Sequence, residues 1–510
     1  MIMKTIRLLF LLLLFPAILF NSCKKSESQL GKALFRESRN PVFKEIEPAE
    51  LAPVLEQMLE EKDMKYGKLI AGFYREHNYT PQLLERYLPG GEMELLLEYY
   101  NKAHEHGLDP AMFQPEDLKR LLDTLGDKNS IQTSGEASRF LARLELLTAS
   151  SLAAYAGALQ YGVTNPSEIY ERYYIETARP DSLFLRRLFQ AEDPGAYLDS
   201  IQPAGKQYKA LQKALAEGVR APDLGPEESK RILQVNLERL RWKNKPSSDK
   251  YVEVNIPDFT LKVVEKGKRV LDMKVCVGEG RNLDEAGQLS ETGNDKIEDR
   301  PGRWETPQLN SLIDHVQVNP VWNIPESIAS REIIKYAAAD RYYLENSNID
   351  VYRDGEKVED SRKIKWEKVS KDDMPYTFKQ RPGDQNALGK IKFLFKNQSS
   401  VYLHDTPAQA AFEKSMRAVS HGCVRVEKPL ELAQALFGEG SEYELVKKEM
   451  ASDNPEARNI SLPEKVPVYL TYYTCWLDEE NQLQFRRDIY GLDLVLFSHL
   501  QGSSGQQPAH

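Results

Sequence analysis

The stretch with the most suggestive chemistry runs from Val401 to Val426; it begins V-Y-L-H-D-T-P and ends S-H-G-C-V-R-V. It contains two of the eight histidines of the 510-residue chain, His404 and His421, and one of the four cysteines, Cys423. A thiolate nucleophile needs an imidazole that accepts its proton and backbone N–H groups that bind the oxyanion it creates. The 19-residue spacing from His404 to Cys423 fits a strand, an excursion and a returning strand that bring the two side chains together.

Two other interpretations of these residues stay open on spacing alone. A histidine and a cysteine can lie near each other by chance, and zinc bound by His404, His421 and Cys423 would keep one open position for water. No C-x-x-C or H-x-x-x-H spacing in the chain favours zinc. A thiol enzyme is thus one of three interpretations that the spacing allows; we expect no metal and no other cofactor.

The segment also resembles the active site of a known enzyme family. Eighteen residues separate His404 from Cys423, and Cys423 lies within the sequence S-H-G-C-V-R. This pattern is similar to the signature of the YkuD-type L,D-transpeptidases. Residues 386–393 (N-A-L-G-K-I-K-F) resemble the N-x-L-G-x-x-K-F segment that precedes that site, and residues 319–325 (N-P-V-W-N-I-P) resemble the N-P-x-W-x-V-P segment of the long, periplasmic members. Residues 72–81 and 106–109 resemble their helical scaffold, so the resemblance covers roughly residues 65 to 490.

The resemblance implies a peptidoglycan L,D-transpeptidase that acts on stem peptides of the bacterial wall. In that reaction a cysteine thiolate attacks the carbonyl of the third residue of a tetrapeptide stem, expels the terminal D-alanine and passes the acyl group to an amine of a neighbouring stem, which gives a 3→3 cross-link. The third residue is implied to be a diamino acid, often meso-diaminopimelate. The alternatives are an L,D-carboxypeptidase, an enzyme that attaches proteins to the wall or cuts such links, and a non-catalytic wall-binding scaffold.

The residues nearest the nucleophile have candidate roles in that reaction. Either His404 deprotonates Cys423, or the two rest as an ion pair with a depressed thiol pKa. The backbone N–H groups of Gly422 and Cys423, with the Tyr402 hydroxyl, are the candidates for the oxyanion hole. The carbonyl or the carboxylate of Asp405 is expected to orient the second nitrogen of His404.

Five further residues are candidates with less defined roles. His421 is expected to tune the thiol electrostatically or to bond the backbone of the nucleophile turn, and a purely structural role is equally open. If V-R-V is extended, Arg425 points to the same face as the thiol and could hold a stem carboxylate bidentately, the alternative being an internal salt bridge. Ser420, Trp322 and Asn319 are the remaining candidates for substrate contact.

The N-terminus predicts export and a lipid anchor. Two basic residues precede an apolar run over 8–20, which is too short to span a bilayer comfortably and fits a signal peptide. The sequence F-N-S-C at its end resembles a lipobox, so we predict a signal peptide over 1–22, a lipid on Cys23 and a tether over 23–44. The predicted location is the cell envelope, facing the periplasm, with the outer membrane favoured over the inner. An ordinary signal peptide with an incidental cysteine is the alternative.

Composition limits the remaining possibilities. The formal net charge of -9 argues against nucleic acid as a partner. Outside the two cysteines already named, Cys276 and Cys475 remain; we predict that Cys276 fills the core, with a disulfide between the two as the alternative.

The predicted fold is α+β and multidomain. Helical periodicity predicts an all-helical scaffold over 45–243, in which only a dozen residues, 217–228, stand where the family carries a peptidoglycan-binding module. Alternation of period two then predicts a mainly antiparallel β catalytic domain over 249–498, with a capping insertion at about 326–380. The polar residues 499–510 are predicted to be a disordered tail.

Overall fold

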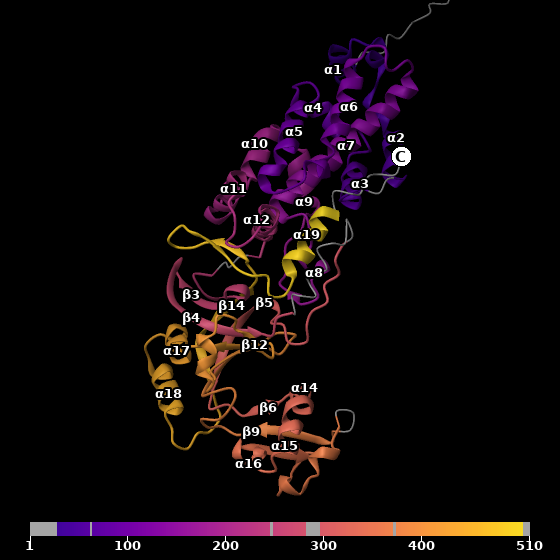
Figure 1. Cartoon of the computed structure of the whole chain (residues 1–510). Coiled ribbons are helices and arrows are strands. Elements are labelled where there is room, and N and C mark those ends of the chain that lie inside the picture. The colour runs from indigo at the N-terminus through magenta and orange to yellow at the C-terminus, as the bar shows by residue number, and fades with distance from the viewer. Residues whose placement is uncertain (1–27, 62–63, 245–247, 282–295, 371–373, 503–510) are drawn as a thin grey trace, which may run out of the picture.

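The computed structural model describes residues 28–61, 64–244, 248–281, 296–370 and 374–502. A helical half, a β-barrel and a small subdomain follow one another through the molecule (Figure 1). The predicted fold class, a helical N-terminal region followed by a mainly antiparallel β domain, is confirmed.

The helical half is built around one long helix, α7. A capping box of Thr133 and Glu136 starts this helix, and its side chains are buried on almost every side from Ala137 to Leu159. The other helices surround it because each has one apolar face to bury. The bounds are α1 Gln29–Ser38, α2 Pro48–Glu61, α3 Gly67–Glu76, α4 Gln82–Tyr87, α5 Glu92–Asn101, α6 Pro115–Gly126, α7 Ser134–Tyr161, α8 Pro166–Ile169, α9 Ser182–Phe189, α10 Pro194–Ser200, α11 Lys206–Glu217 and α12 Pro226–Arg241.

The tether predicted over 23–44 is wrong from residue 28 onward. Ser28 caps helix α1, whose Leu30 and Leu34 are buried in the core of the helical half. A short 3-10 helix, Pro41–Glu45, follows and buries Phe43. The apolar residues are few, but they fall on one helical face, so the segment packs. The predicted signal peptide and Cys23 lie outside the described residues.

The catalytic half is a closed barrel. Its strands follow the order β5-β10-β11-β13-β4-β3-β2-β14, and pairing of β14 with β5 closes the ring. Most neighbouring strands of the ring are antiparallel, but β11 with β13 and β14 with β2 are parallel. The bounds are β2 Lys250–Asn255, β3 Thr260–Glu265, β4 Lys268–Gly278, β5 Gln308–Val318, β10 Ile391–Phe395, β11 Leu403–His404, β13 Val424–Val426 and β14 Arg458–Thr471.

Two short strands extend this sheet. Strand β12 (Ala418–Ser420) pairs with β4, and β1 (Tyr173–Tyr174), which comes from the helical half, pairs in parallel with β5. Helices α17 (Pro429–Phe437) and α18 (Ser441–Met450) contact the outside of the barrel. Strand β1 thus joins the two halves through backbone hydrogen bonds.

The predicted capping insertion folds as a subdomain with its own core. Strands β6 (Trp322–Ile324), β9 (Tyr376–Gln380), β7 (Ile349–Arg353) and β8 (Glu356–Lys357) form its sheet in that order. Helical segments cover it, and the apolar side chains between the two layers form a cluster separate from the barrel core. The helical bounds are α14 Glu326–Ile328, η6 Ala329–Ile333, α15 Ile334–Ala339, α16 Tyr343–Asn346, η7 Ser361–Lys363 and η8 Trp366–Lys368.

The end of the chain returns to the helical half. The hairpin of β15 (Cys475–Leu477) and β16 (Leu483–Phe485) contacts α11 and α12, and helix α19 (Leu492–Gly502) packs on α12 (Figure 1). The guanidinium of Arg239 on α12 lies 2.6 Å from the carboxylate of Asp493 on α19, and both are almost fully buried. Residues 499–502, predicted as part of a disordered tail, therefore continue a packed helix; 503–510 lie outside the described residues.

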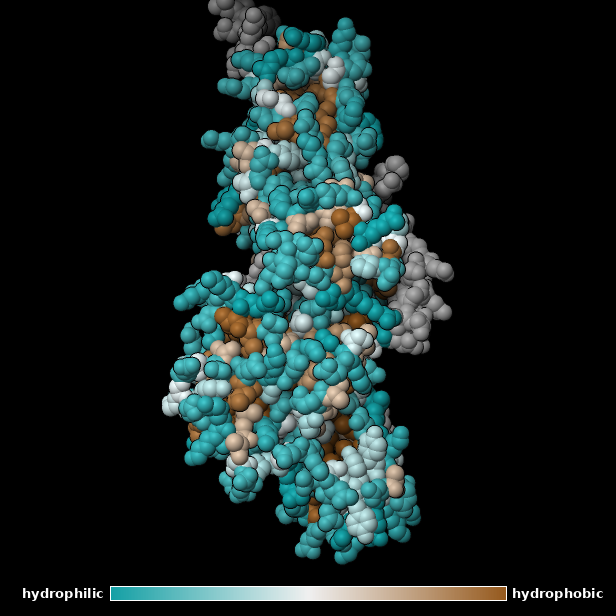
Figure 2. Space-filling model, turned by 60° about the vertical axis from the view of Figure 1, so that its left-hand side comes forward, coloured by the Kyte–Doolittle hydropathy of each residue, from teal (hydrophilic) through white to brown (hydrophobic). Residues whose placement is uncertain are grey.

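The surface is largely hydrophilic in the view of Figure 2, where apolar residues form separate patches on both halves. Within the described ranges, none of the helices combines the length and the apolar character that a membrane crossing requires.

Candidate active site

The predicted strand, excursion and return are present: His404 ends β11, and Cys423 directly precedes the neighbouring strand β13. Strand β11 pairs in parallel with β13, with Leu403 opposite Val424 and His404 opposite Arg425. On its other side β11 pairs with β10, with Lys392 opposite His404. The excursion between β11 and β13 carries β12, which is held by β4.

Five polar side chains share one face of this part of the barrel. Residues opposite each other on paired strands point to the same face, and alternate residues along a strand do so too. The hydrogen-bond ladder between β11 and β13 begins one residue before β11, because the Val424 N–H donates to the Tyr402 carbonyl at 3.0 Å. The residues on the shared face are Lys392, Tyr402, His404, Cys423 and Arg425. The opposite face carries Leu403 and Val424, which are buried in the core.

The thiol of Cys423 is held by Tyr402. Both the backbone N–H and the hydroxyl of Tyr402 donate to the sulfur. Burial raises the pKa of the Cys423 thiol, while the two bonds from Tyr402 and the cations Lys392 and Arg425 act in the opposite direction. Burial also raises the pKa of Tyr402, with a further contribution from Cys423, so its phenol keeps the proton that it donates.

His404 is neutral and its base nitrogen is free of a proton. Nδ1 lies 2.5 Å from the carbonyl oxygen of Asp405, an acceptor, so Nδ1 carries the hydrogen. The pKa of His404 is lowered to about 3: burial has the largest effect, Arg425 and Lys392 add to it, and the hydrogen bond to the Asp405 carbonyl opposes it. Nε2 is therefore unprotonated. Together with the raised pKa of the Cys423 thiol, this favours a neutral thiol and a neutral imidazole over the two charged groups of an ion pair.

The two possible roles of Asp405 are separated by its partners. Its carboxylate accepts the backbone N–H groups of Lys390 at 2.8 Å and Thr406 at 2.7 Å, so only its carbonyl is available to His404. Gly389 makes room for that carboxylate: its φ is +60°, and a Cβ there would come within 2.3 Å of the Asp405 carboxyl carbon. The N-x-L-G segment thus supports the orientation of the base.

The nucleophile turn is fixed by hydroxyl groups. Ser420 Oγ accepts the Gly422 N–H at 3.2 Å and donates to the Cys423 carbonyl at 2.5 Å, while Thr306 Oγ1 donates to the Gly422 carbonyl at 2.9 Å. The φ of Gly422 is +107°, a conformation that favours glycine. Ser420 is buried and engaged within the turn, so its prediction as a substrate contact is wrong. Within the described part of the chain the Cys423 N–H has no hydrogen-bond acceptor, whereas the Gly422 N–H is engaged by Ser420.

His421 faces the capping subdomain. Its Nε2 lies 2.6 Å from a carboxylate oxygen of Glu332, which belongs to η6 of that subdomain. The ring of Trp304 packs edge-on against the His421 imidazole at 4.7 Å, and Trp304 also packs on the core of the subdomain. His421 therefore joins the nucleophile turn to the capping subdomain, a role that sequence reasoning did not anticipate because the partner is 89 residues away.

The remaining candidates differ in how near they come to the site. Asn319 is buried, with a φ of +48° and a side-chain amide that donates to the Glu449 carbonyl at 2.8 Å, so its predicted substrate contact is wrong. Trp322 lies in β6 at the base of the capping subdomain and packs on its core. Arg425 is half-buried on the shared face, and no carboxylate of the described ranges pairs with it.

Lys392 is the site residue that sequence reasoning missed. Its ammonium lies 5.4 Å from the centre of the Tyr402 ring and close enough to Cys423 for the thiol to affect its pKa. The available signal was its place in the G-x-x-K-F segment, but only strand register shows that it lies opposite His404.

The other cysteines are structural. Cys276 and Cys475 are free and buried, which excludes the disulfide alternative. The zinc alternative is not supported by geometry either, since no three His, Cys, Asp or Glu side chains within the described ranges are grouped as a metal site would need.

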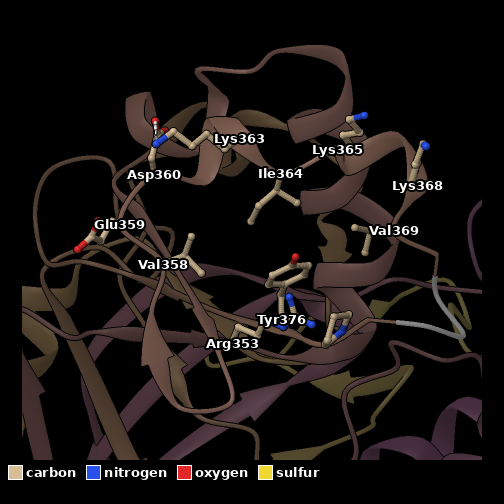
Figure 3. A pocket seen from close by; sticks show the side chains of 11 residues that line it. Arg353, Val358, Glu359, Asp360, Lys363, Ile364, Lys365, Lys368, Val369 and Tyr376 are labelled. Atoms are coloured by element: carbon tan, nitrogen blue, oxygen red, sulfur yellow. Dashed lines mark ion pairs between the residues drawn. The ribbon is translucent and has the colours of Figure 1, made fainter.

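A hollow of about 690 Å³ lies in the capping subdomain (Figure 3). Its rim carries Lys363, Lys365 and Lys368, and Tyr376 and Ile364 extend toward its centre. None of its lining residues belongs to the thiol–imidazole site.

Comparison with known proteins adds to this geometry. Residues 249–437 match the L,D-transpeptidase catalytic domain of the YkuD family, and residues 68–215 match the Scaffold domain. A Haemophilus influenzae protein whose name assigns it to the L,D-transpeptidases is 28% identical over 326 residues, which are 64% of this chain and 61% of that protein. The chain thus matches about three fifths of the length of this relative.

Solved structures are more distant. An L,D-transpeptidase from Mycobacterium smegmatis is 12% identical with a TM-score of 0.20, over 44% of this chain and 58% of that chain. The Ldtfm–avibactam carbamoyl enzyme is 9% identical with a TM-score of 0.19, over 49% of this chain and 64% of that chain. Similarity at this level supports no inference about fold or function.

The barrel and the family match together define a chain with an L,D-transpeptidase catalytic domain. Residues 249–437 match the YkuD catalytic domain, and residues 68–215, which precede them in the chain, match the Scaffold domain.

Proposed function

We propose that this chain is a peptidoglycan L,D-transpeptidase that uses Cys423 as its nucleophile and forms 3→3 cross-links between tetrapeptide stems. The observation that carries the proposal is a thiol held by the Tyr402 hydroxyl on the same barrel face as a neutral His404 with an unprotonated Nε2. The match to an L,D-transpeptidase domain supports the same class of reaction.

Acylation begins with proton transfer to the imidazole. The S–H proton of Cys423 passes to Nε2 of His404 while the sulfur bonds to the carbonyl carbon of the third stem residue. The Cys423 N–H, which has no other acceptor within the described residues, donates to the oxyanion, and the Tyr402 hydroxyl lies beside it. The C–N bond to D-alanine then breaks, His404 returns the proton to the departing nitrogen, and a thioester remains on Cys423.

Transfer to a second stem completes the cycle. An amine of that stem attacks the thioester carbonyl, His404 accepts one of the amine protons, and the released thiolate of Cys423 takes this proton back. Water would compete with the amine and yield a shortened stem. The contact between His421 and Glu332 holds the capping subdomain beside the nucleophile turn, where it limits access of water to the thioester.

The proposed location is the periplasmic side of the cell envelope, through a lipid on Cys23, with the outer membrane favoured. The supporting observation is the basic and apolar N-terminus that ends in F-N-S-C. Replacing Cys23 with alanine should move the protein from the membrane fraction to the soluble fraction. Retention of the Cys23→Ala protein on membranes would contradict an anchor at this residue.

The test is incubation of the purified protein with disaccharide-tetrapeptides and mass analysis of the products. Cross-linked dimers with loss of D-alanine support the proposal. Tripeptide release without dimers identifies an L,D-carboxypeptidase instead, and unchanged substrate identifies a binding scaffold. Cys423→Ala must abolish any product, while Cys475→Ala, which changes a free cysteine outside the site, must preserve it.

A further inference from the structure

Two cations flank the catalytic base and lack a protein counterion. Lys392 on β10 and Arg425 on β13 each lie opposite His404, one on either side of β11, and both are half-buried. Within the part of the chain that the structure describes, neither side chain has a hydrogen bond or an ion pair with an acidic group. The ammonium of Lys392 lies over the ring of Tyr402.

Three arginines that are more deeply buried are paired with carboxylates. Arg239 lies 2.6 Å from Asp493, Arg241 lies 2.7 Å from Glu238, and Arg281 is held by two carboxylates. A charge withdrawn from water is unfavourable unless a counterion or a ligand compensates it. The absence of such a partner at Lys392 and Arg425 therefore points to an anionic ligand that binds over His404.

We propose that Lys392 binds the C-terminal carboxylate of the amino acid that the reaction expels. The inference rests on the proposed function and extends it to a residue of this chain and a group of the substrate. In a tetrapeptide donor, the nitrogen of the scissile bond belongs to the last residue, whose free carboxylate is two bonds away. His404 must reach that nitrogen to protonate it, so the expelled residue lies next to His404.

The strand order assigns the two cations to different parts of the donor. The acyl part becomes bonded to Cys423, and Arg425 lies on β13, the strand that directly follows Cys423, so Arg425 is assigned to the acyl part. Lys392 lies on the opposite side of His404, on β10, and its ammonium leans over the ring of Tyr402. This is the side left for the departing residue. The site thereby selects donors that end one residue beyond the scissile bond.

The test compares binding of two donors to the Cys423→Ala protein, which cannot turn them over. One is the disaccharide-tetrapeptide, and the other is the same molecule with its terminal carboxylate converted to a carboxamide. Calorimetry should give about tenfold tighter binding of the acid, as expected for one hydrogen bond to a charged group. Adding Lys392→Met should abolish this preference without weakening the amide, and Lys392→Arg should retain it.

The controls separate this inference from the proposed function. Arg425→Met should weaken acid and amide equally, since its partner is in the acyl part. Persistence of the acid preference in the Lys392→Met protein, or the lack of any preference before that change, overturns the inference. If the role of Lys392 fails but the unaltered enzyme still forms dimers, the proposed transpeptidase function stands. A Cys423→Ala protein that binds neither donor contradicts both the role of Lys392 and the proposed function.

Discussion

Removing the hydroxyl of Tyr402 should make Cys423 a weaker acid. In the Tyr402→Phe protein the sulfur keeps the backbone N–H of residue 402 as a donor but loses the phenol, while the aromatic ring stays under Lys392. A donor to sulfur favours the thiolate, so its loss raises the thiol pKa above the already raised value. The direction of the shift is therefore upward.

The size of the shift follows from one hydrogen bond to a charged group. Such a bond contributes about 1.5–3 kcal/mol, and about 1.4 kcal/mol corresponds to one pKa unit, which gives a rise of about 1–2 units. At a pH below the thiol pKa the thiolate fraction falls tenfold per unit. Alkylation of Cys423 at neutral pH should then slow by about 10–100-fold.

The assay is the rate of iodoacetamide alkylation of Cys423 as a function of pH, followed by mass spectrometry. Tyr251→Phe is the matched control, because Tyr251 lies in β2 and packs against Tyr469, away from the site. An alkylation pKa that stays unchanged or falls in the Tyr402→Phe protein would refute the role given to this hydroxyl. An equal shift in the Tyr251→Phe protein would refute it too.

Three further changes test other parts of the structure. Gly389→Ala places a Cβ within 2.3 Å of the Asp405 carboxyl carbon, so kcat should fall about 100-fold through a displaced base, while circular dichroism stays unchanged; an active variant would contradict this support. Glu332→Gln removes the charge opposite the imidazole at 2.6 Å, and the ratio of released tripeptide to dimer should rise; a constant ratio would show that the contact does not limit water. Arg239→Met leaves a carboxylate buried without its partner, and urea unfolding should show a loss of about 3–5 kcal/mol, whereas a loss below about 1 kcal/mol would contradict the packing of α19 on α12.

Local patterns drew attention to the candidate nucleophile and base, and the resemblance to the YkuD signature turned them into a prediction. The spacing from His404 to Cys423 and the glycine before the thiol lie within one short stretch, and alternation along the strand placed Tyr402 and His404 on one face. The helical half and the β half followed from their different periodicities.

Long-range partners decided the predictions that were wrong or missing. Ser420 is next to the nucleophile in sequence but is buried by hydrogen bonds within its own turn, and the amide of Asn319 is engaged by the distant Glu449 carbonyl. Lys392 joins the site only through the register of β10 against β11, which one sequence does not reveal. The segment after Ser28 contains mostly polar residues, and its apolar face became evident only once it was seen to pack.

The most direct test of the central claim is the intact mass of the enzyme mixed with a tetrapeptide donor and quenched early. The predicted result is an adduct of one acyl-tripeptide on Cys423, located by peptide mapping, with an equal amount of free D-alanine and no adduct on the Cys423→Ala protein. An adduct on another residue, or D-alanine release by the protein without this thiol, would contradict it.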